Sequence, residues 1–95
     1  VRSLAEYRAA RADGVLACWI GVQGGNAVPA ELLDRTPDLS RITLVHFTQS
    51  EIGTSANDGL RREDGLSAYG KDYVARMVAA RIQVDLSHIN RRGFH

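Results

Sequence analysis

The chain has 95 residues, enough for one small domain at most, and its 44% apolar content is that of a globular protein. Twelve basic and eleven acidic side chains leave a formal net charge of +1, which excludes the strongly basic surface of a nucleic-acid-binding protein. No apolar run approaches the roughly 18 residues that would span a bilayer, so we expect neither a nucleic-acid partner nor a membrane segment.

The first expected element is a helix over residues 3–13, which Ser3 caps and Gly14 ends. The continuous apolar run Val15–Val22 follows it. Continuous rather than alternating hydrophobicity is typical of a strand that is covered on both faces, as in a parallel sheet. The single cysteine, Cys18, lies in this run, so we expect a buried, reduced thiol rather than a disulfide or a nucleophile.

A second strand is predicted over Arg41–Phe47, after a short helix that begins near Pro29. His46 falls near the end of this strand. Its imidazole has two interpretations, which stay open at this point. It is either a histidine hydrogen-bonded to loop backbone or part of the wall of a site at the strand ends.

The polar segment of residues 48–64 is predicted to be a long loop, and loops of this length are usually functional or disordered. Asp58, Glu63 and Asp64 are its candidate metal ligands. They lack the spacing of a calcium-binding loop, and turn formation explains these residues better.

A second helix is predicted over Ala68–Ala80, capped by Ser67, and a third strand over Ile82–Leu86. Gly70 in the first turn costs about 1 kcal/mol relative to alanine, which a close contact between helix and strand would explain. Strands that alternate with helices indicate an α/β fold with about three parallel strands. Because three such strands leave exposed edges, we expect a fragment of a larger barrel or doubly wound sheet.

The carboxyl ends of parallel strands share one rim, which would bring Gln23, His46 and His88 together. Asp85 would either orient a neighbour by a hydrogen bond or lie buried and paired. The three histidines of the chain form no HxH, HxD or HExxH pattern, so their spacing does not define a metal site.

Four segments in order resemble the membrane (renal) dipeptidase family of zinc metallopeptidases. The run Gly65-Leu66-Ser67 to Gly70, then a helix, then Val84-Asp85-Leu86-Ser87-His88 is similar to one family pattern. Ile20–Ala27, Ile42–His46 and Asn57-Asp58-Gly59 are similar to its glycine-rich strand end, its next strand and the following loop. The resemblance implies that residues 1–95 are part of a single (β/α)₈ barrel domain that hydrolyses dipeptides with two bridged zinc ions.

The resemblance also implies roles for particular residues. His88 matches the histidine that reaches the substrate near the scissile carbonyl, so we expect it to contact the substrate or transition state. His46 and Asp85 are further candidates for substrate binding. Gln23 stands where the family has a bridging glutamate, and a neutral amide cannot bridge two zinc ions. One metal ion, a changed activity and a non-catalytic protein that binds small peptides or a partner all stay open.

The HxD pair and the two later histidines that bind zinc in the family have no counterpart in this chain. We therefore expect the isolated chain to lack peptidase activity. The expected substrate of the parent protein is a dipeptide or another small amide, with a homodimer as one open possibility. A different barrel amidohydrolase is the least favoured alternative, because its HxH strand end is missing.

Overall fold

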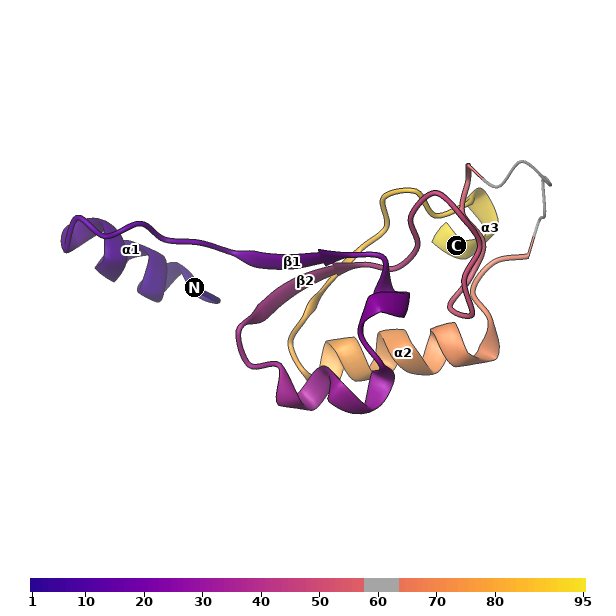
Figure 1. Ribbon diagram of the computed structural model, residues 1–95, viewed down its shortest axis with the longest axis horizontal. Helices are drawn as coiled ribbons and strands as arrows, with labels where there is room; N and C mark the ends of the chain where they lie inside the picture. Colours follow the sequence, from indigo (N-terminus) through magenta and orange to yellow (C-terminus); the bar gives the residue numbers. More distant parts are fainter. Residues whose placement is uncertain (58–63) are drawn as a thin grey trace.

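The computed structural model describes residues 1–57 and 64–95, which form a parallel three-stranded sheet and the helices around it (Figure 1). The strand order is β1-β2-β3, and both neighbouring pairs are parallel. The elements are α1 (Leu4–Ala12), β1 (Ile20–Gln23), the 3₁₀ helices η1 (Gly25–Ala27) and η2 (Ala30–Arg35), β2 (Leu39–Thr43), α2 (Ala68–Ala79), β3 (Gln83–Asp85) and α3 (Arg91–Phe94). The predicted alternation of helices and parallel strands is confirmed.

The two faces of the sheet differ in polarity, because successive residues of a strand point to opposite faces. Val22, Ile42 and Val84 are aligned across the three strands and pack into the apolar core with α2. In each strand, the residues directly before and after these three point to the opposite face of the sheet. They form two rows, one of Gly21, Arg41 and Gln83 and one of Gln23, Thr43 and Asp85. The face opposite α2 is therefore polar, and functional side chains are expected there.

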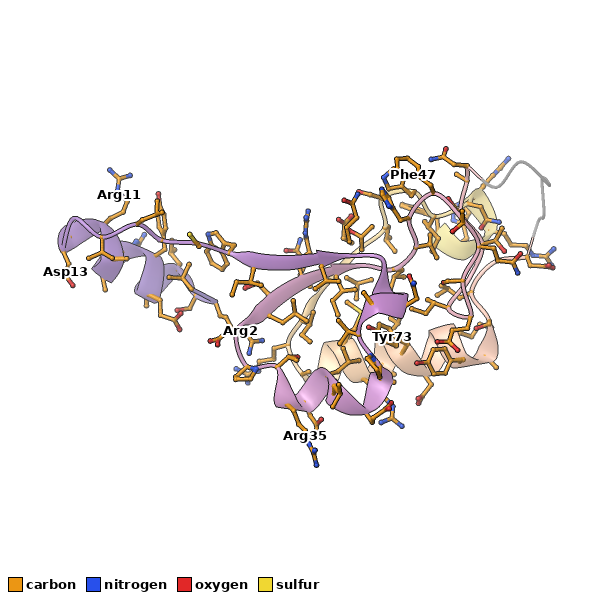
Figure 2. All side chains as sticks on the ribbon, in the orientation of Figure 1. Arg2, Arg11, Asp13, Arg35, Phe47 and Tyr73 are labelled. Carbon is orange, nitrogen blue, oxygen red and sulfur yellow. The ribbon has the colours of Figure 1, made fainter. Side chains whose placement is uncertain are left out.

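The core lies between the sheet and α2, which runs along the sheet in Figure 1. Tyr73 on α2 is fully buried, and its hydroxyl lies 3.0 Å from the carbonyl oxygen of Gly25 and 2.9 Å from that of Val28 (Figure 2). Tyr73 thus connects the helix to the segment that follows β1. The other buried apolar residues are Ala30, Leu33, Leu39, Ile42, Leu44, Val45, Ile52, Met77, Ile82 and Ile89.

The ends of α2 follow from its sequence. The Ser67 hydroxyl accepts a hydrogen bond from the Gly70 amide at 2.9 Å, as predicted for an N-cap. At the other end, Arg81 adopts a left-handed conformation with φ of 57°, and Ile82 N–H donates to the Met77 carbonyl at 2.8 Å. A Cβ on Gly70 would lie 1.9 Å from the Ile52 carbonyl oxygen. The close contact expected at Gly70 is therefore present, but with loop backbone instead of a strand.

The N-terminal part extends away from the sheet as an arm that comprises α1 and residues 13–19 (Figure 1). The predicted strand over Val15–Val22 is wrong at its start, because pairing with β2 begins only at Ile20. Residues 15–19 pass beyond the sheet, so the described part of the chain leaves most of them uncovered. Cys18 is accordingly exposed, not buried as predicted.

The residues before α1 are held against the body by hydrogen bonds, and the Ser40 hydroxyl donates one of them to the Val1 carbonyl at 3.2 Å. The Arg2 guanidinium donates hydrogen bonds to the carbonyl oxygens of Pro37, Ala80 and Arg81 at 2.6–3.0 Å. Two of these carbonyls lie at the C-terminal end of α2, where a positive charge is favourable. Within residues 1–57 and 64–95, no helix is long and apolar enough to cross a bilayer.

The second strand was predicted at Arg41–Phe47 but is Leu39–Thr43. Its partner β3 has only three residues, and the pairing ends where Thr43 meets Asp85. Beyond that point the backbone turns, so His46 follows the strand rather than belonging to it. The helix predicted near Pro29 is the 3₁₀ helix η2.

Candidate functional site at the strand ends

The last residues of the three strands, Gln23, Thr43 and Asp85, lie in one row on the polar face. Gln23 is exposed, whereas Thr43 is only 2% exposed. Directly after Gln23, Gly24 has φ of 92° and donates its N–H to the Thr43 carbonyl at 3.0 Å. Because glycine adopts such a backbone angle without steric cost, the chain can turn sharply at the end of β1.

Asp85 is held by four contacts from three residues. Its carboxylate accepts hydrogen bonds from the Ser87 hydroxyl at 2.7 Å, the Ser87 N–H at 2.9 Å and the Thr43 hydroxyl at 2.8 Å, and it pairs with Arg41 at 3.2 Å. The Ser87 bonds, with smaller contributions from Thr43 and Arg41, lower the pKa of Asp85 to about 2. Asp85 is thus an ionised group that joins β3 to β2 and shapes the turn toward His88.

His88 has a left-handed backbone with φ of 65°, an unusual conformation for a residue other than glycine. The surrounding structure fixes it there. The Ala56 N–H donates to the His88 carbonyl at 2.7 Å, and the Ser55 hydroxyl lies 3.2 Å from the same oxygen. A non-glycine residue in this region costs on the order of 1 kcal/mol, and such residues are concentrated at functional sites.

The His88 ring lies in an aromatic cluster with His46 and Phe47, the latter labelled in Figure 2. The ring centroids of His46 and His88 are 4.9 Å apart in an edge-on arrangement, and those of Phe47 and His88 are 5.2 Å apart. The Asn57 side-chain nitrogen lies 3.2 Å from His88 Nδ1. Among the described contacts, the Nε2 atom of His88 is the ring nitrogen left for a ligand.

Three side chains were expected at the rim: Gln23, His46 and His88. The structure brings His46 and His88 into contact. The His46 ring contacts the His88 ring, and its backbone carbonyl accepts a hydrogen bond from the Ser55 hydroxyl. Neither contact decides between the two interpretations of its imidazole. Gln23 lies at the same edge of the sheet, but none of its described contacts reaches either histidine. Its role, and those of Asp85 and His46 toward a substrate, remain predictions.

The described residues do not form a metal centre by themselves. Residues 1–57 and 64–95 contain no group of three or more His, Cys, Asp or Glu side chains placed to hold a metal ion. Of the loop ligands considered from the sequence, Asp58 and Glu63 lie outside the described residues. The Asp64 carbonyl accepts a hydrogen bond from the Asn90 amide at 2.8 Å. The residue at the expected bridging position, Gln23, is neutral. The strand-end row therefore does not fit a pair of zinc ions bridged by a carboxylate at this position.

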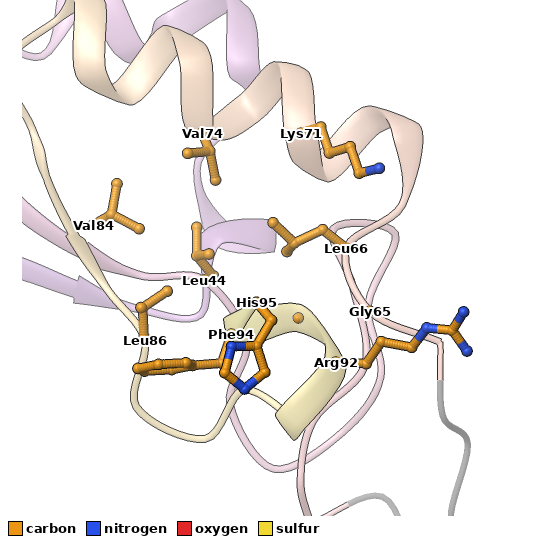
Figure 3. A pocket seen from close by; sticks show the side chains of 11 residues that line it. Leu44, Gly65, Leu66, Lys71, Val74, Val84, Leu86, Arg92, Phe94 and His95 are labelled. Carbon is orange, nitrogen blue, oxygen red and sulfur yellow. The ribbon is translucent and has the colours of Figure 1, made fainter.

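A pocket of about 520 Å³ lies elsewhere, between α2 and the C-terminal residues (Figure 3). It is lined by apolar side chains such as Leu44, Val74 and Val84, together with Lys71 and Arg92. Leu44 and Val84 lie on the apolar side of the sheet. This pocket is therefore separate from the polar row and the histidine cluster.

Sequence reasoning missed two residues that build the site, Ser55 and Thr43. Both are nearly inaccessible, at 2% exposed, and both bond to groups far away in the sequence. A serine in a polar loop and a threonine in a strand carry no local signal of such a role. Asn57 was noted as part of the segment Asn57-Asp58-Gly59, which is a turn signal and is similar to the family's loop, but not as a contact of His88.

The parallel sheet and the polar groups at its carboxyl edge define an α/β protein of the class that places functional residues at the strand ends. The chain belongs to the membrane dipeptidase family (peptidase family M19), whose model matches residues 1–95. The resemblance seen in the sequence motifs is thus confirmed.

Two solved structures are similar over 99% of this chain, each with 27% sequence identity. One is an amidohydrolase from Pseudomonas aeruginosa, with a TM-score of 0.84. The other is a metallopeptidase from Rhodobacter sphaeroides liganded with a phosphinate mimic of the dipeptide L-Ala-D-Ala, with a TM-score of 0.80. This chain spans 29% of the length of each. The expectation of a three-stranded portion of a larger barrel is confirmed.

Proposed function

We propose that this chain is part of a metal-dependent dipeptidase that cleaves the peptide bond of dipeptides, and that His88 contacts the substrate at the scissile carbonyl. Membership of the dipeptidase family supports the reaction class. The metallopeptidase liganded with a dipeptide mimic supports the substrate class. A phosphinate has the tetrahedral geometry that forms when water attacks an amide, as expected of a transition-state analogue.

The observation that carries this proposal is the constrained geometry of His88. Its backbone is left-handed and is held by two contacts from the loop, and its ring packs edge-on against His46. No described group occupies Nε2. An Nε2–H group aimed at the carbonyl oxygen would stabilise the negative charge that develops there during attack by water. His46 and Phe47 would form the adjoining wall of the substrate site, and Asp85 would fix the strand end that carries His88.

Zinc is the metal that we propose, on the basis of the family resemblance. A bound zinc ion would supply an activated water and polarise the carbonyl. For this chain, substrate contact and orientation are the roles that we propose for His88, His46 and Asp85. We further propose that this chain alone is inactive.

Hydrolysis of L-Ala-D-Ala by the full gene product that carries this sequence tests the proposal. We expect His88→Gln to lower kcat/KM at least about 100-fold, as for the loss of one oxyanion donor. His95→Gln is the matched control, since it makes the same chemical change at an exposed histidine outside the strand-end row and the histidine cluster. Equal losses in the two variants, or full activity of His88→Gln, would contradict a role for His88 at the scissile bond.

A non-catalytic protein that binds small peptides is the second candidate, and Gln23 favours it. The neutral side chain is exposed at the end of β1, where the family resemblance implies a bridging carboxylate. Metal analysis of the full gene product beside Gln23→Glu separates the candidates. A gain of bound zinc and of dipeptide hydrolysis in Gln23→Glu supports the second candidate. Two zinc ions in the unmodified protein would refute it.

A further inference from the structure

Phe47 is an exposed aromatic side chain at the carboxyl edge of the sheet. It follows β2 in the chain and is 59% exposed. Figure 2 shows it on the side of the sheet away from α2, which is the side of the polar row. Two other exposed apolar residues, Leu86 and Phe94, line the pocket on the apolar side, and Trp19 precedes β1 at the opposite end of the sheet. Phe47 thus brings a large apolar surface to the polar face.

The Phe47 ring is held in place by its neighbours. Its centroid lies 3.9 Å from that of the His46 ring, with the ring planes tilted by 35°, and 5.2 Å from that of the His88 ring, with the planes at 70°. Aromatic rings in tilted or edge-on contact attract each other beyond the effect of burial. These contacts cover part of the ring and leave the rest exposed. A ligand would therefore meet a ring that is already oriented and would not have to immobilise it.

The polar groups near this ring are compatible with an apolar ligand. The Asn57 side chain, which lies 3.2 Å from His88 Nδ1, is an uncharged amide. The Asp85 carboxylate is engaged by its four contacts within the sheet and the following turn. An apolar group packed on Phe47 would thus leave neither of these groups with an unpaired charge. Ligand sites commonly combine an aromatic wall of this kind with a few fixed polar groups.

We propose that Phe47 is a specificity-determining residue that packs against an apolar side chain of the dipeptide, so that apolar dipeptides are the preferred substrates. This inference rests on the proposed function and adds the class of substrate. It requires that the dipeptide lies on the polar side of the strand ends. It assigns no chemical role to either histidine.

Paired dipeptides isolate this contact, because leucine and asparagine side chains have nearly the same size and shape but differ in polarity. The full gene product is assayed with L-Leu-D-Ala against L-Asn-D-Ala, and with L-Ala-D-Leu against L-Ala-D-Asn. We expect kcat/KM to be at least about 10-fold higher for the leucine member of one pair, since burial favours an apolar group over an unpaired amide. No preference for leucine in either pair would overturn the inference.

Variants at position 47 test whether the ring causes the preference. Phe47→Asn should reduce the preference at least about fivefold, whereas Phe47→Leu keeps an apolar surface and should retain most of it. Phe94→Asn is the matched control, because it makes the same change at a phenylalanine that is 60% exposed but lines the separate pocket. It should leave the preference as it was. Thermal unfolding checks that each variant is folded, as expected for substitutions at exposed positions.

Two results with these variants would overturn the inference. One is a leucine preference that Phe47→Asn leaves unchanged. The other is an equal loss of kcat/KM for all four dipeptides in Phe47→Asn, which would indicate a contact with the groups that these dipeptides share.

Binding measurements separate a failure of the proposed function from a failure of this inference. If none of the four dipeptides is hydrolysed, the proposed function fails. Calorimetric titration with the same dipeptides then compares their dissociation constants. A leucine preference that Phe47→Asn loses would support the contact in a protein that only binds peptides. The absence of a preference, or of any binding, would overturn it.

Discussion

Replacement of Gly70 by alanine tests how the first turn of α2 packs against the loop that leads to the histidine cluster. Helix propensity alone predicts that Gly70→Ala stabilises the protein by about 1 kcal/mol. The structure predicts the opposite sign. A Cβ at this position would lie 1.9 Å from the Ile52 carbonyl oxygen and 2.9 Å from its carbon.

The size of the effect follows from this overlap. Both atoms belong to rigid backbone, so the helix or the loop must move by roughly 1 Å to restore an ordinary contact. Overpacking of this kind usually costs about 1–3 kcal/mol. The Ile52 carbonyl also accepts a hydrogen bond from the Ser67 N–H at 3.0 Å, and displacement would weaken this bond as well. After the propensity gain is subtracted, we expect a net loss of about 2 kcal/mol.

Urea unfolding of the full gene product, followed by circular dichroism, gives the difference in stability. Ala75→Gly, on an exposed face of the same helix, is the control for propensity and should cost about 1 kcal/mol. A Gly70→Ala variant as stable as the unmodified protein, or more stable, would refute the close packing of α2 on Ile52. We also expect Gly70→Ala to reduce dipeptide hydrolysis, because Ile52 begins the segment that positions Ser55.

Three further predictions concern single residues. Tyr73→Phe should lower the free energy of unfolding by about 1–2 kcal/mol, because the hydroxyl that bonds to the Gly25 and Val28 carbonyls is removed. Ultraviolet titration should show the Tyr73 pKa, raised by burial, at about 12. The folded-state pKa of Asp85, about 2, lies below its unfolded value of about 3.9. Its contribution of about 2 kcal/mol is therefore complete above about pH 5 and is lost as the pH falls through 4 toward 2. The stability gap between the unmodified protein and Asp85→Asn, measured by urea unfolding, should close over this range. His88→Gly should abolish dipeptide hydrolysis yet leave the thermal unfolding midpoint unchanged or higher, because glycine relieves the left-handed backbone; a markedly lower midpoint would show that the ring contributes chiefly to packing.

The elements that are determined locally could be predicted from the sequence. The cap at Ser67 and the apolar spacing of the following residues located α2 to within one residue of its end. Strand limits were less accurate, because they depend on the partner. The run Val15–Val22 is apolar throughout, yet only its last three residues and Gln23 find a neighbouring strand. Similarly, the second strand was predicted to begin at Arg41, but Leu39 already pairs with Ile20.

The sequence predicted the site residues that lie in family motifs. It did not predict the residues whose contacts depend on how the loop folds. His88 and His46 were both expected at the strand ends, and their rings do meet. That Ser55 and Asn57 would hold His88 depends on how residues 50–57 fold back over the end of β3. No periodicity or spacing in the sequence encodes that path.

The exposed arm has a practical consequence for handling the polypeptide. Leu16 is 85% exposed and Trp19 54% exposed, and both precede β1, an edge strand of the sheet that the described residues form. Such a strip of uncovered hydrophobic side chains beside free backbone amides favours self-association. The 95-residue polypeptide on its own should form soluble aggregates as its concentration rises, and exchange of these two side chains for lysine should keep it monodisperse in light scattering.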